Sequence, residues 1–284
     1  MEIVQNKALK FRTRKADLIT NSIPKSAVLR RNGDVAEMLV HWGWEETRVL
    51  RNMKIRDVPY TIARDYNWPG VFRPFDHQKD TAGFLTAHHK CYCFSEQGTG
   101  KTMAVAWAAD YLLTIGAIKR VLIVCLVSVM DAAWRADLFR TVMHRRVEIA
   151  HGTAKNRIAA IESGAEFVII NYDGIHTVQE TLEAGGFDLI VLDEANAVKN
   201  VATRRWKSVN RLVRPDTRLW LLTGTPASQA LTLDSNILTP TGWVKMRDIS
   251  VGDEVIGSDG APTNVMGVWP QGYKEIFRVH FNDG

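Results

Sequence analysis

The sequence has no apolar run long enough to cross a membrane. Its longest apolar run, residues 121–130, is about half of the roughly 20 residues that a membrane helix needs. The basic residues near the N-terminus are not followed by the apolar core of a secretory signal. We therefore predict a cytoplasmic protein without a membrane partner.

Cysteine is also scarce. The three cysteines, Cys91, Cys93 and Cys125, form no C-x-x-C pair and have no histidine or cysteine at the spacing of a zinc site. Each of them lies in a strand-like run or at its end. We predict buried thiols in a reducing compartment rather than a metal centre.

The remaining composition is that of an ordinary globular protein, but its charge is uneven. Hydrophobic residues make up 46% and charged residues 24% of the sequence. The length of 284 residues is enough for about two domains. The net charge is +5, and residues 1–75 hold 14 lysines and arginines against 8 aspartates and glutamates. A basic segment of this kind suits a polyanion such as DNA, although a solubilising surface explains it equally well.

Residues 90–226 alternate short apolar runs with helical stretches, which is typical of a parallel sheet wrapped by helices. We expect the strands to be buried on both faces because their runs are almost continuously apolar. The predicted strands are 91–94, 121–125, 167–170, 189–192 and 219–222, and the predicted helices are 101–115, 131–142, 154–163 and 177–184. This α/β layout is typical of nucleotide-binding domains.

The stretch 95–102, S-E-Q-G-T-G-K-T, matches the end of a Walker A phosphate loop, with Ser95 in place of the first glycine. It follows a strand-like run and opens a predicted helix, as a phosphate loop does. In such a loop small residues let backbone N–H groups surround phosphate oxygens, a lysine supplies charge and a hydroxyl binds Mg²⁺. We assign these three roles to Gly98, Thr99 and Gly100, to Lys101, and to Thr102.

Two adjacent carboxylates, Asp193 and Glu194, follow the apolar run 189–192. They would lie at the edge where an α/β sheet binds its ligands. Asp193 can hold Mg²⁺ through its hydration shell, and Glu194 can polarise an attacking water. Such a pair is often only a helix N-cap, but the upstream phosphate loop favours the catalytic interpretation.

Six motifs stand in the order found in superfamily 2 helicases: Gln78, the G-T-G-K-T loop, 121–128, 170–173, 193–196 and 222–226. Over roughly residues 60–229 the series resembles the Swi/Snf-type DNA translocases, particularly the compact versions carried by bacteriophages. The resemblance implies a RecA-like lobe that uses ATP and Mg²⁺, with Gln78 reading adenine. It also implies that these residues contact DNA or couple nucleotide state to DNA: Ser128, Asn171, Tyr172, Thr223 and Thr225.

The match departs from the family at two positions. Asn196 stands where a histidine is usual, which bears on the coupling of nucleotide state to DNA. Leu126 stands where a proline is usual. The resemblance also implies a second lobe that brings an arginine finger, and the chain does not contain that lobe. We therefore expect the isolated chain to bind ATP weakly and to hydrolyse it slowly.

Residues 1–70 form a basic accessory segment ahead of the predicted lobe at 71–229. Trp42 and Trp44 lie close in sequence to Arg48, Arg51 and Lys54, and interleaved aromatics and cations can clamp nucleic acid. We favour the alternative of a small accessory domain with its tryptophans inside, since tryptophan is commonly buried.

After Ala230 the helical spacing disappears, and strand-like pieces alternate with turn signals, at 236–238, 243–246, 254–256, 264–268 and 275–281. Residues 230–284 resemble the opening of an intein, which implies a partial all-β Hint module and a splice junction between Gln229 and Ala230. Most inteins begin with a nucleophile that alanine lacks. Either this intein belongs to an alanine-start class or its nucleophile has been lost.

These observations predict the N-terminal part of an ATP-dependent, Swi/Snf-like DNA helicase or translocase that is interrupted by an intein, in a bacterial or phage-infected cell. An alternative is a splicing precursor or split-intein half, whose partner polypeptide supplies the rest of the intein and the second lobe. A third is a nucleic-acid-binding module with a vestigial ATPase site.

Overall fold

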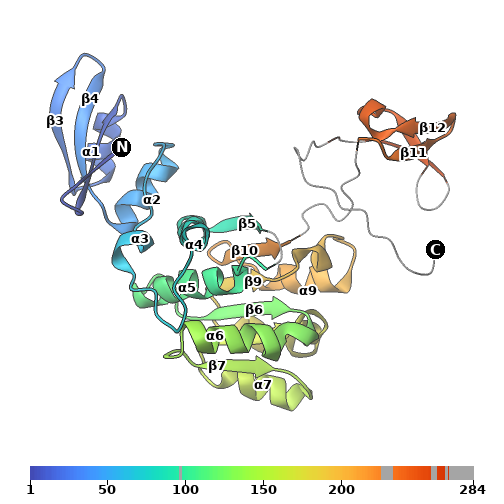
Figure 1. Cartoon of the computed structure of the whole chain (residues 1–284). Helices are drawn as coiled ribbons and strands as arrows, with labels where there is room; N and C mark the ends of the chain where they lie inside the picture. Colours follow the sequence, from blue (N-terminus) through green and yellow to red (C-terminus); the bar gives the residue numbers. More distant parts are fainter. Residues whose placement is uncertain (96–97, 225–232, 257–260, 266–267, 269–284) are drawn as a thin grey trace. The chain divides into compact units, whose positions relative to one another are not determined.

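The computed structural model describes the chain except for residues 96–97, 225–232, 257–260, 266–267 and 269–284 (Figure 1). The chain divides into two compact units, Met1–Pro226 and Ala227–Gly284. Among the described residues, no helix combines the length and the apolar character needed to span a membrane.

The first unit opens with a small antiparallel sheet in the order β1-β2-β4-β3. Its strands are β1 (Glu2–Val4), β2 (Ala8–Thr13), β3 (Ser26–Asn32) and β4 (Val35–His41), with the helices α1 (Ala16–Ser22), α2 (Trp44–Asn52) and α3 (Ile62–Asp65). Alternate residues of β2, namely Leu9 and Phe11, enter a core of their own with Trp42. Trp42 is only 4% exposed, as the interpretation of this segment as an accessory domain requires.

A six-stranded parallel sheet follows, in the order β5-β10-β9-β6-β8-β7. Its strands are β5 (Lys90–Phe94), β6 (Val121–Cys125), β7 (Val147–Ala150), β8 (Phe167–Asn171), β9 (Leu189–Leu192) and β10 (Arg218–Thr223). All residues of β6, β8 and β9 are buried, because helices cover both faces. The predicted α/β class and five of the six strands are confirmed, whereas the sequence interpretation missed β7.

The helices of this lobe are α4 (Asp76–Ala87), α5 (Lys101–Thr114), α6 (Ala136–Thr141), α7 (Ala154–Glu162), α8 (Gln179–Ala184) and α9 (Arg204–Leu212). Two predicted helices begin differently from expectation. The stretch predicted as one helix over 131–142 is a π-helix at Met130–Arg135 that continues into α6. The helix predicted from residue 177 begins at Gln179, because the preceding Tyr172–Val178 forms a 3₁₀-helix.

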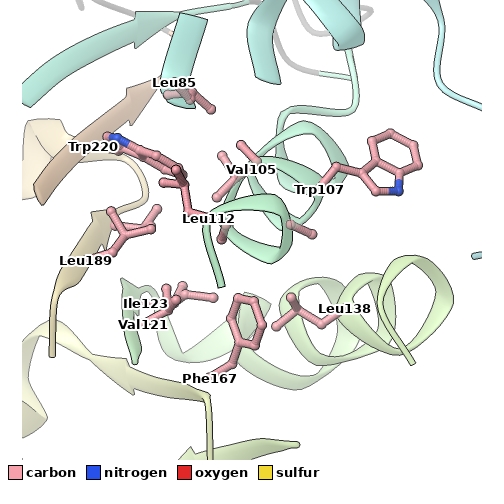
Figure 2. Packing of buried hydrophobic residues seen from close by; sticks show 14 of the residues in the cluster. Leu85, Val105, Trp107, Leu112, Val121, Ile123, Leu138, Phe167, Leu189 and Trp220 are labelled. Carbon is pink, nitrogen blue, oxygen red and sulfur yellow. The ribbon is translucent and has the colours of Figure 1, made fainter. Parts of the chain in front are cut away.

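Successive residues of the buried strands face two separate apolar layers. Val121 and Ile123 of β6 pack toward α4, α5 and α6, together with Leu85, Leu112 and Trp220 (Figure 2). Leu122 and Val124 face the opposite layer, which is formed with α7, α8 and α9. This alternation follows from the two-residue repeat of a strand. Both faces of the central strands are therefore dry.

The cysteines lie inside this lobe as unpaired thiols. Cys93 and Cys125 are buried and Cys91 is half-buried. Burial is the main cause that raises the pKa of both the Cys91 and Cys125 thiols to about 12. The described residues contain no cluster of histidine, cysteine or acidic side chains that could hold a metal ion. The prediction of buried thiols is confirmed for Cys93 and Cys125.

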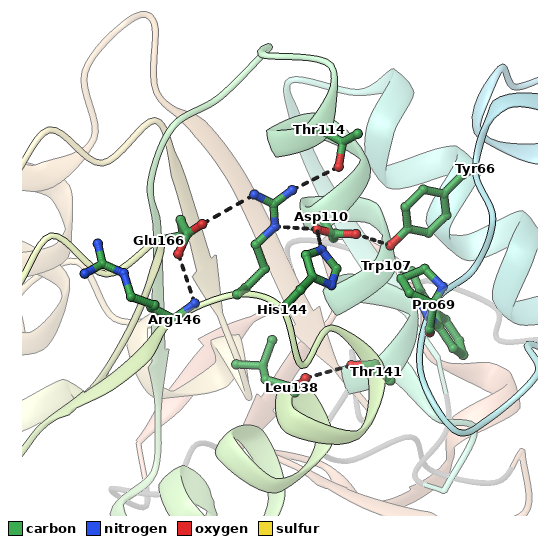
Figure 3. Close-up of polar contacts among 11 residues, drawn as sticks. Tyr66, Pro69, Trp107, Asp110, Thr114, Leu138, Thr141, His144, Arg146 and Glu166 are labelled. Carbon is green, nitrogen blue, oxygen red and sulfur yellow. Dashed lines mark hydrogen bonds and ion pairs between the residues drawn. The ribbon is translucent and has the colours of Figure 1, made fainter.

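A buried carboxylate on α5 connects the lobe to the segment that precedes it. Asp110 is 1% exposed and accepts hydrogen bonds from Arg145 Nε at 2.6 Å and from the Tyr66 hydroxyl, while His144 Nε2 lies 3.0 Å away (Figure 3). Arg145 also donates to Glu166. Burial is the first cause, and the Asp110 charge the second, of a raised pKa at Tyr66. This network fixes four segments to one another.

The second unit contains two antiparallel strand pairs among its described residues. β11 (Asn236–Thr239) pairs with β12 (Gly242–Lys245), and β13 (Glu254–Ile256) pairs with β14 (Pro262–Asn264). The strands predicted at 236–238, 243–246 and 254–256 are confirmed within one residue. The strand predicted at 264–268 coincides with β14 only at Asn264, and the piece at 275–281 lies outside the described residues.

Substitution of Arg145 by methionine tests the buried network. It removes the guanidinium from Asp110 and leaves a buried charge with fewer donors, so the free energy of unfolding should fall by about 3 kcal/mol. Arg146→Met is the matched control, because Arg146 is exposed and its Nη2 donates to the Gly164 carbonyl rather than to the Asp110 network. That control should lose less than about 1 kcal/mol. Denaturant unfolding followed by tryptophan fluorescence measures both, and equal losses would contradict the assignment.

Candidate functional site

The predicted phosphate loop lies between β5 and α5, at the carboxyl end of the parallel sheet. Gly100 precedes α5 in the left-handed region, with φ +75°, and Lys101 is the first helical residue. The N-terminus of a helix carries free N–H groups and a partial positive charge, which together favour an anion. The local geometry therefore fits the phosphate-binding role predicted for residues 98–101.

Hydrogen bonds close the loop on itself. The Lys101 ammonium donates to the Ser95 carbonyl at 2.6 Å, and the hydroxyls of Ser95 and Thr99 lie 2.7 Å apart. The backbone N–H of Ser95 donates to the Thr223 carbonyl of β10 at 3.3 Å. Ser95, which replaces the usual first glycine, thus contributes its hydroxyl to the loop's own structure.

Gln78 on α4 contacts this loop directly. Although it lies on a helix, the residue is only 3% exposed. Its Oε1 accepts from the Phe75 N–H at 3.0 Å, and its Nε2 donates to the Thr99 carbonyl at 3.2 Å. His77 Nε2 lies 3.1 Å from the same carbonyl. Whether Gln78 reads adenine stays a prediction; the observed contact is with the phosphate loop.

The carboxylate pair follows β9, and its first member is held from several sides. Asp193 Oδ2 accepts from Trp134 Nε1 at 2.8 Å, and Oδ1 accepts from the Glu194 N–H at 3.1 Å. The Tyr172 hydroxyl donates to the Asp193 carbonyl at 2.7 Å. Burial raises the pKa of Asp193, while the Trp134 bond, the Glu194 N–H and the Lys101 charge oppose that rise. The carboxylate is thus half-buried and oriented by neutral donors.

Glu194 occupies a left-handed backbone conformation, with φ +50°. Such a conformation is uncommon for a residue with a side chain and is found preferentially at functional sites. Glu194 precedes the short 3₁₀-helix Ala195–Val198, but its side chain forms no capping hydrogen bond there. The alternative that this pair serves only as a helix cap therefore gains no support.

The sequence interpretation missed the hydrogen bond between Trp134 and Asp193. Trp134 is 1% exposed and lies in the π-helix, 59 residues before its partner Asp193. The sequence placed it in a predicted helix after a predicted strand, but no local pattern names an acceptor so far away. Only the three-dimensional arrangement of β6 beside β9 brings them together.

The residues predicted to contact DNA differ in their accessibility. Ser128 is exposed, in the 3₁₀ turn Val127–Val129 after β6. Asn171 and Tyr172 are buried, and Asn171 Oδ1 accepts from Arg157 at 2.9 Å. Burial leaves the Asn171 and Tyr172 side chains facing the protein interior. A DNA contact at these two positions would therefore not involve exposed side chains.

The predicted coupling residue Thr223 ends β10 and is 3% exposed. Its hydroxyl accepts a hydrogen bond from Asn196 Nδ2 at 3.3 Å. Asn196, which replaces the family's histidine, therefore still connects the carboxylate segment to the end of β10. Thr225 and the predicted splice junction, Gln229 and Ala230, lie outside the described residues.

The donors available for a magnesium ion are the hydroxyl of Thr102, in the first turn of α5, and the carboxylate of Asp193. Oxygen donors of this kind fit Mg²⁺, which usually keeps several waters and takes its remaining ligands from carboxylates and substrate phosphates. The donor set is consistent with a hydrated ion beside a bound phosphate group.

Comparison with known proteins gives the family. The SNF2-related domain family matches residues 12–234, so the chain belongs to this family. The structure is similar to the SWI2/SNF2 ATPase core of Sulfolobus solfataricus solved in complex with dsDNA, with 22% identity and a TM-score of 0.50. That match covers 57% of this chain and 33% of the solved chain, and it supports the fold.

Two curated relatives match shorter stretches. The replicative DNA helicase DnaB of Mycobacterium intracellulare is 35% identical over 81 residues, which is 28% of this chain and 12% of that protein. DnaB of Mycobacterium leprae is 40% identical over 57 residues, which is 20% of this chain and 9% of that protein. The chain thus spans about a tenth of the length of these relatives.

Two glycines of the phosphate loop provide a matched test of its packing against Gln78. A Cβ on Gly100 would lie 2.1 Å from Gln78 Nε2, whereas no described atom lies within 4 Å of a Cβ on Gly98. Both glycines have positive φ, so each alanine should cost about 1 kcal/mol of backbone strain. Gly100→Ala should lose about 2 kcal/mol more through overpacking. If denaturant unfolding shows the same loss of unfolding free energy in both variants, the Gln78 side chain moves aside without an energetic penalty.

Proposed function

We propose that the chain is part of an ATP-dependent DNA translocase of the SNF2 family, in which ATP hydrolysis is coupled to DNA binding. The observation that carries the proposal is that Lys101, at the start of α5, and Asp193, directly after β9, both follow strands at the carboxyl edge of the parallel sheet. The positive charge of Lys101 also lowers the pKa of the half-buried Asp193 carboxylate, against the effect of burial. A helix N-terminus, a lysine and a carboxylate form the electrostatic set that phosphoryl transfer requires.

In this mechanism the ATP phosphates bind at the N-terminus of α5. Lys101 exchanges its bond with the Ser95 carbonyl for the β- and γ-phosphate oxygens. The Thr102 hydroxyl and the Asp193 carboxylate would hold Mg²⁺, which would supply positive charge to the phosphate groups. Trp134 and the Glu194 N–H hold the Asp193 carboxylate in a single orientation. Glu194 accepts a proton from a water that attacks the γ-phosphate in line, and ADP leaves.

Duplex DNA is the proposed partner. The SNF2 relative was solved with dsDNA, and the present lobe exposes Ser128 at the carboxyl end of β6. The Asn196–Thr223 hydrogen bond is a direct link by which a change at the carboxylates reaches the end of β10. We propose that this link transmits nucleotide state to the residues that follow, toward a second lobe with an arginine finger.

Substitutions at the two charged groups separate binding from chemistry. Lys101→Ala should abolish ATP binding, whereas Glu194→Gln should keep ATP binding and lower γ-phosphate release by at least about 100-fold. Lys119→Ala, at an exposed lysine outside the site, is the control and should leave both unchanged. Equilibrium titration with ATP and single-turnover phosphate release measure these effects. Fast DNA-stimulated turnover by residues 1–284 alone would contradict the requirement for a second lobe.

The second unit supports a further proposal, that an intein interrupts the ATPase. β10 ends at Thr223, and the described residues that resume at 233 form antiparallel strand pairs in a compact unit of their own. A separate β-rich unit directly after the end of β10 favours an inserted module over a continuation of the lobe. On the alternative, the chain is a splicing precursor or split-intein half.

The splicing proposal predicts a joined product. Mixing this chain with a polypeptide that carries the remaining intein and the second lobe should give one ligated chain that lacks residues 230–284, because splicing removes the module and joins its flanks. Intact-mass spectrometry identifies the junction after Gln229. If no ligated chain forms while both polypeptides remain folded, the module is not a splicing element in this pair.

A further inference from the structure

A group of cationic side chains lines a surface hollow of about 810 Å³ on the N-terminal sheet. We call it the basic hollow. Its cations are Lys10, Arg12, Arg14, Lys15, Lys54 and Arg56, and its carboxylates are Glu2 and Glu37. Six positive charges face two negative ones, a surplus of four where the whole chain has a net charge of +5. The hollow therefore dominates the charge of the protein.

The fold brings these cations together from two segments. Leu9, Phe11 and Thr13 of β2 point into the core, so the alternating Lys10 and Arg12 face outward in a row. The second segment follows α2. Lys15 joins the two, because its Nζ donates to the carbonyl of Met53 at 2.6 Å. The hydrogen bond from Lys15 to Met53 and the alternating burial of β2 residues therefore bring these cations together.

Three of the cations are not engaged by the protein. Lys10 pairs with Glu2 and Glu37 at 3.6 and 3.7 Å, and Arg12 lies 4.0 Å from Glu37. Within the described part of the chain, no ion pair or side-chain hydrogen bond reaches Arg14, Lys54 or Arg56, which are all exposed. Their charges are therefore available to an external anion.

Lys54 occupies a position where glycine is the favoured residue. α2 ends in a Schellman motif, in which the Lys54 N–H donates to the Arg51 carbonyl at 2.8 Å and the Ile55 N–H donates to the Leu50 carbonyl at 3.0 Å. Lys54 adopts φ +59° there. Glycine takes this conformation without strain, whereas lysine does not. A lysine held in a strained turn beside other unpaired cations points to a function for its charge.

We propose that the basic hollow binds the phosphate backbone of duplex DNA, as an accessory contact outside the ATPase lobe. This inference rests on the proposed DNA partner and adds a surface to it. A row of cations along an extended strand matches a polyanion with regularly spaced charges. The described lining offers no exposed aromatic anchor of the kind that a membrane surface uses, because its aromatic residue, Phe11, is buried.

The decisive experiment measures the affinity of the full chain for a labelled 30-base-pair duplex at several salt concentrations. Arg14→Glu/Lys54→Glu/Arg56→Glu should weaken binding by more than about 10-fold and reduce the slope of log affinity against log salt by about 3. Lys7→Glu/Lys25→Glu/Arg30→Glu is the matched control, with the same change of net charge at exposed cations of the same subdomain. It should weaken binding by less than about 3-fold, because charge effects outside the contact surface are screened.

The single variant Lys54→Gly separates the proposed role from a structural one. It should raise the melting temperature or leave it unchanged, because glycine suits the turn, and yet reduce the salt slope by about 1. A stabilised protein with unchanged DNA binding would overturn the inference. Equal losses of DNA affinity in the two triple variants would also overturn the inference, because they would indicate a general effect of net charge.

Two further outcomes distinguish the inference from the proposed function. If the wild-type chain binds DNA and the hollow variant binds equally well, the hollow is not a DNA surface and the proposed DNA partner stands. If the wild-type chain does not bind DNA, both fail. Vesicles of phosphatidylcholine and phosphatidylserine serve as a competing polyanion. Equal losses of vesicle and DNA binding in the hollow variant would overturn the assignment to DNA.

Discussion

A half-buried carboxylate at the end of β9 imposes the main constraint on this lobe. A carboxylate that is partly withdrawn from water needs hydrogen-bond donors from the protein. Asp193 takes those donors from the indole of Trp134 and from the following N–H group, and the Tyr172 hydroxyl fixes its backbone. The strand order places β9 beside β6, so that the segment after β6 reaches it. The central strands, the π-helix and the 3₁₀ turn after β8 therefore all converge on Asp193.

A second constraint is the closeness of the phosphate loop to α4. Gln78 lies so near to Gly100 that a Cβ there would displace its amide, and its two amide atoms bind the loop and the start of its own helix. A residue held in this way cannot move without disturbing the loop. The α4 helix is thus a rigid support for the phosphate site, and any change in the loop must be transmitted to it.

Much of the lobe could be predicted from the sequence because its strands are buried on both faces. The runs at 121–125 and 189–192 are continuously apolar, and the strands predicted from them have the same bounds as β6 and β9. β7 was not predicted, because its four residues include the exposed Glu148 and form no continuous apolar run. The spacing of the phosphate-loop residues predicts their position between β5 and α5, and their binding roles stay predictions. The Trp134–Asp193 contact was not, since a hydrogen bond between distant residues leaves no local trace.

The N-terminal sheet was harder to foresee, yet its attachment explains how it can act with the lobe. Most of β3 is exposed and its residues follow no two-residue repeat of burial, so the strand has little sequence signal. Contacts that fasten the subdomain to the lobe include the bond of Tyr66 to Asp110 and that of the Tyr111 hydroxyl to Thr61, both at α5. The guanidinium of the buried Arg218, the first residue of β10, also lies 5.5 Å from the ring of Trp44. β10 ends at Thr223, the partner of Asn196, so this one strand contacts the N-terminal subdomain at its beginning and the carboxylate segment at its end.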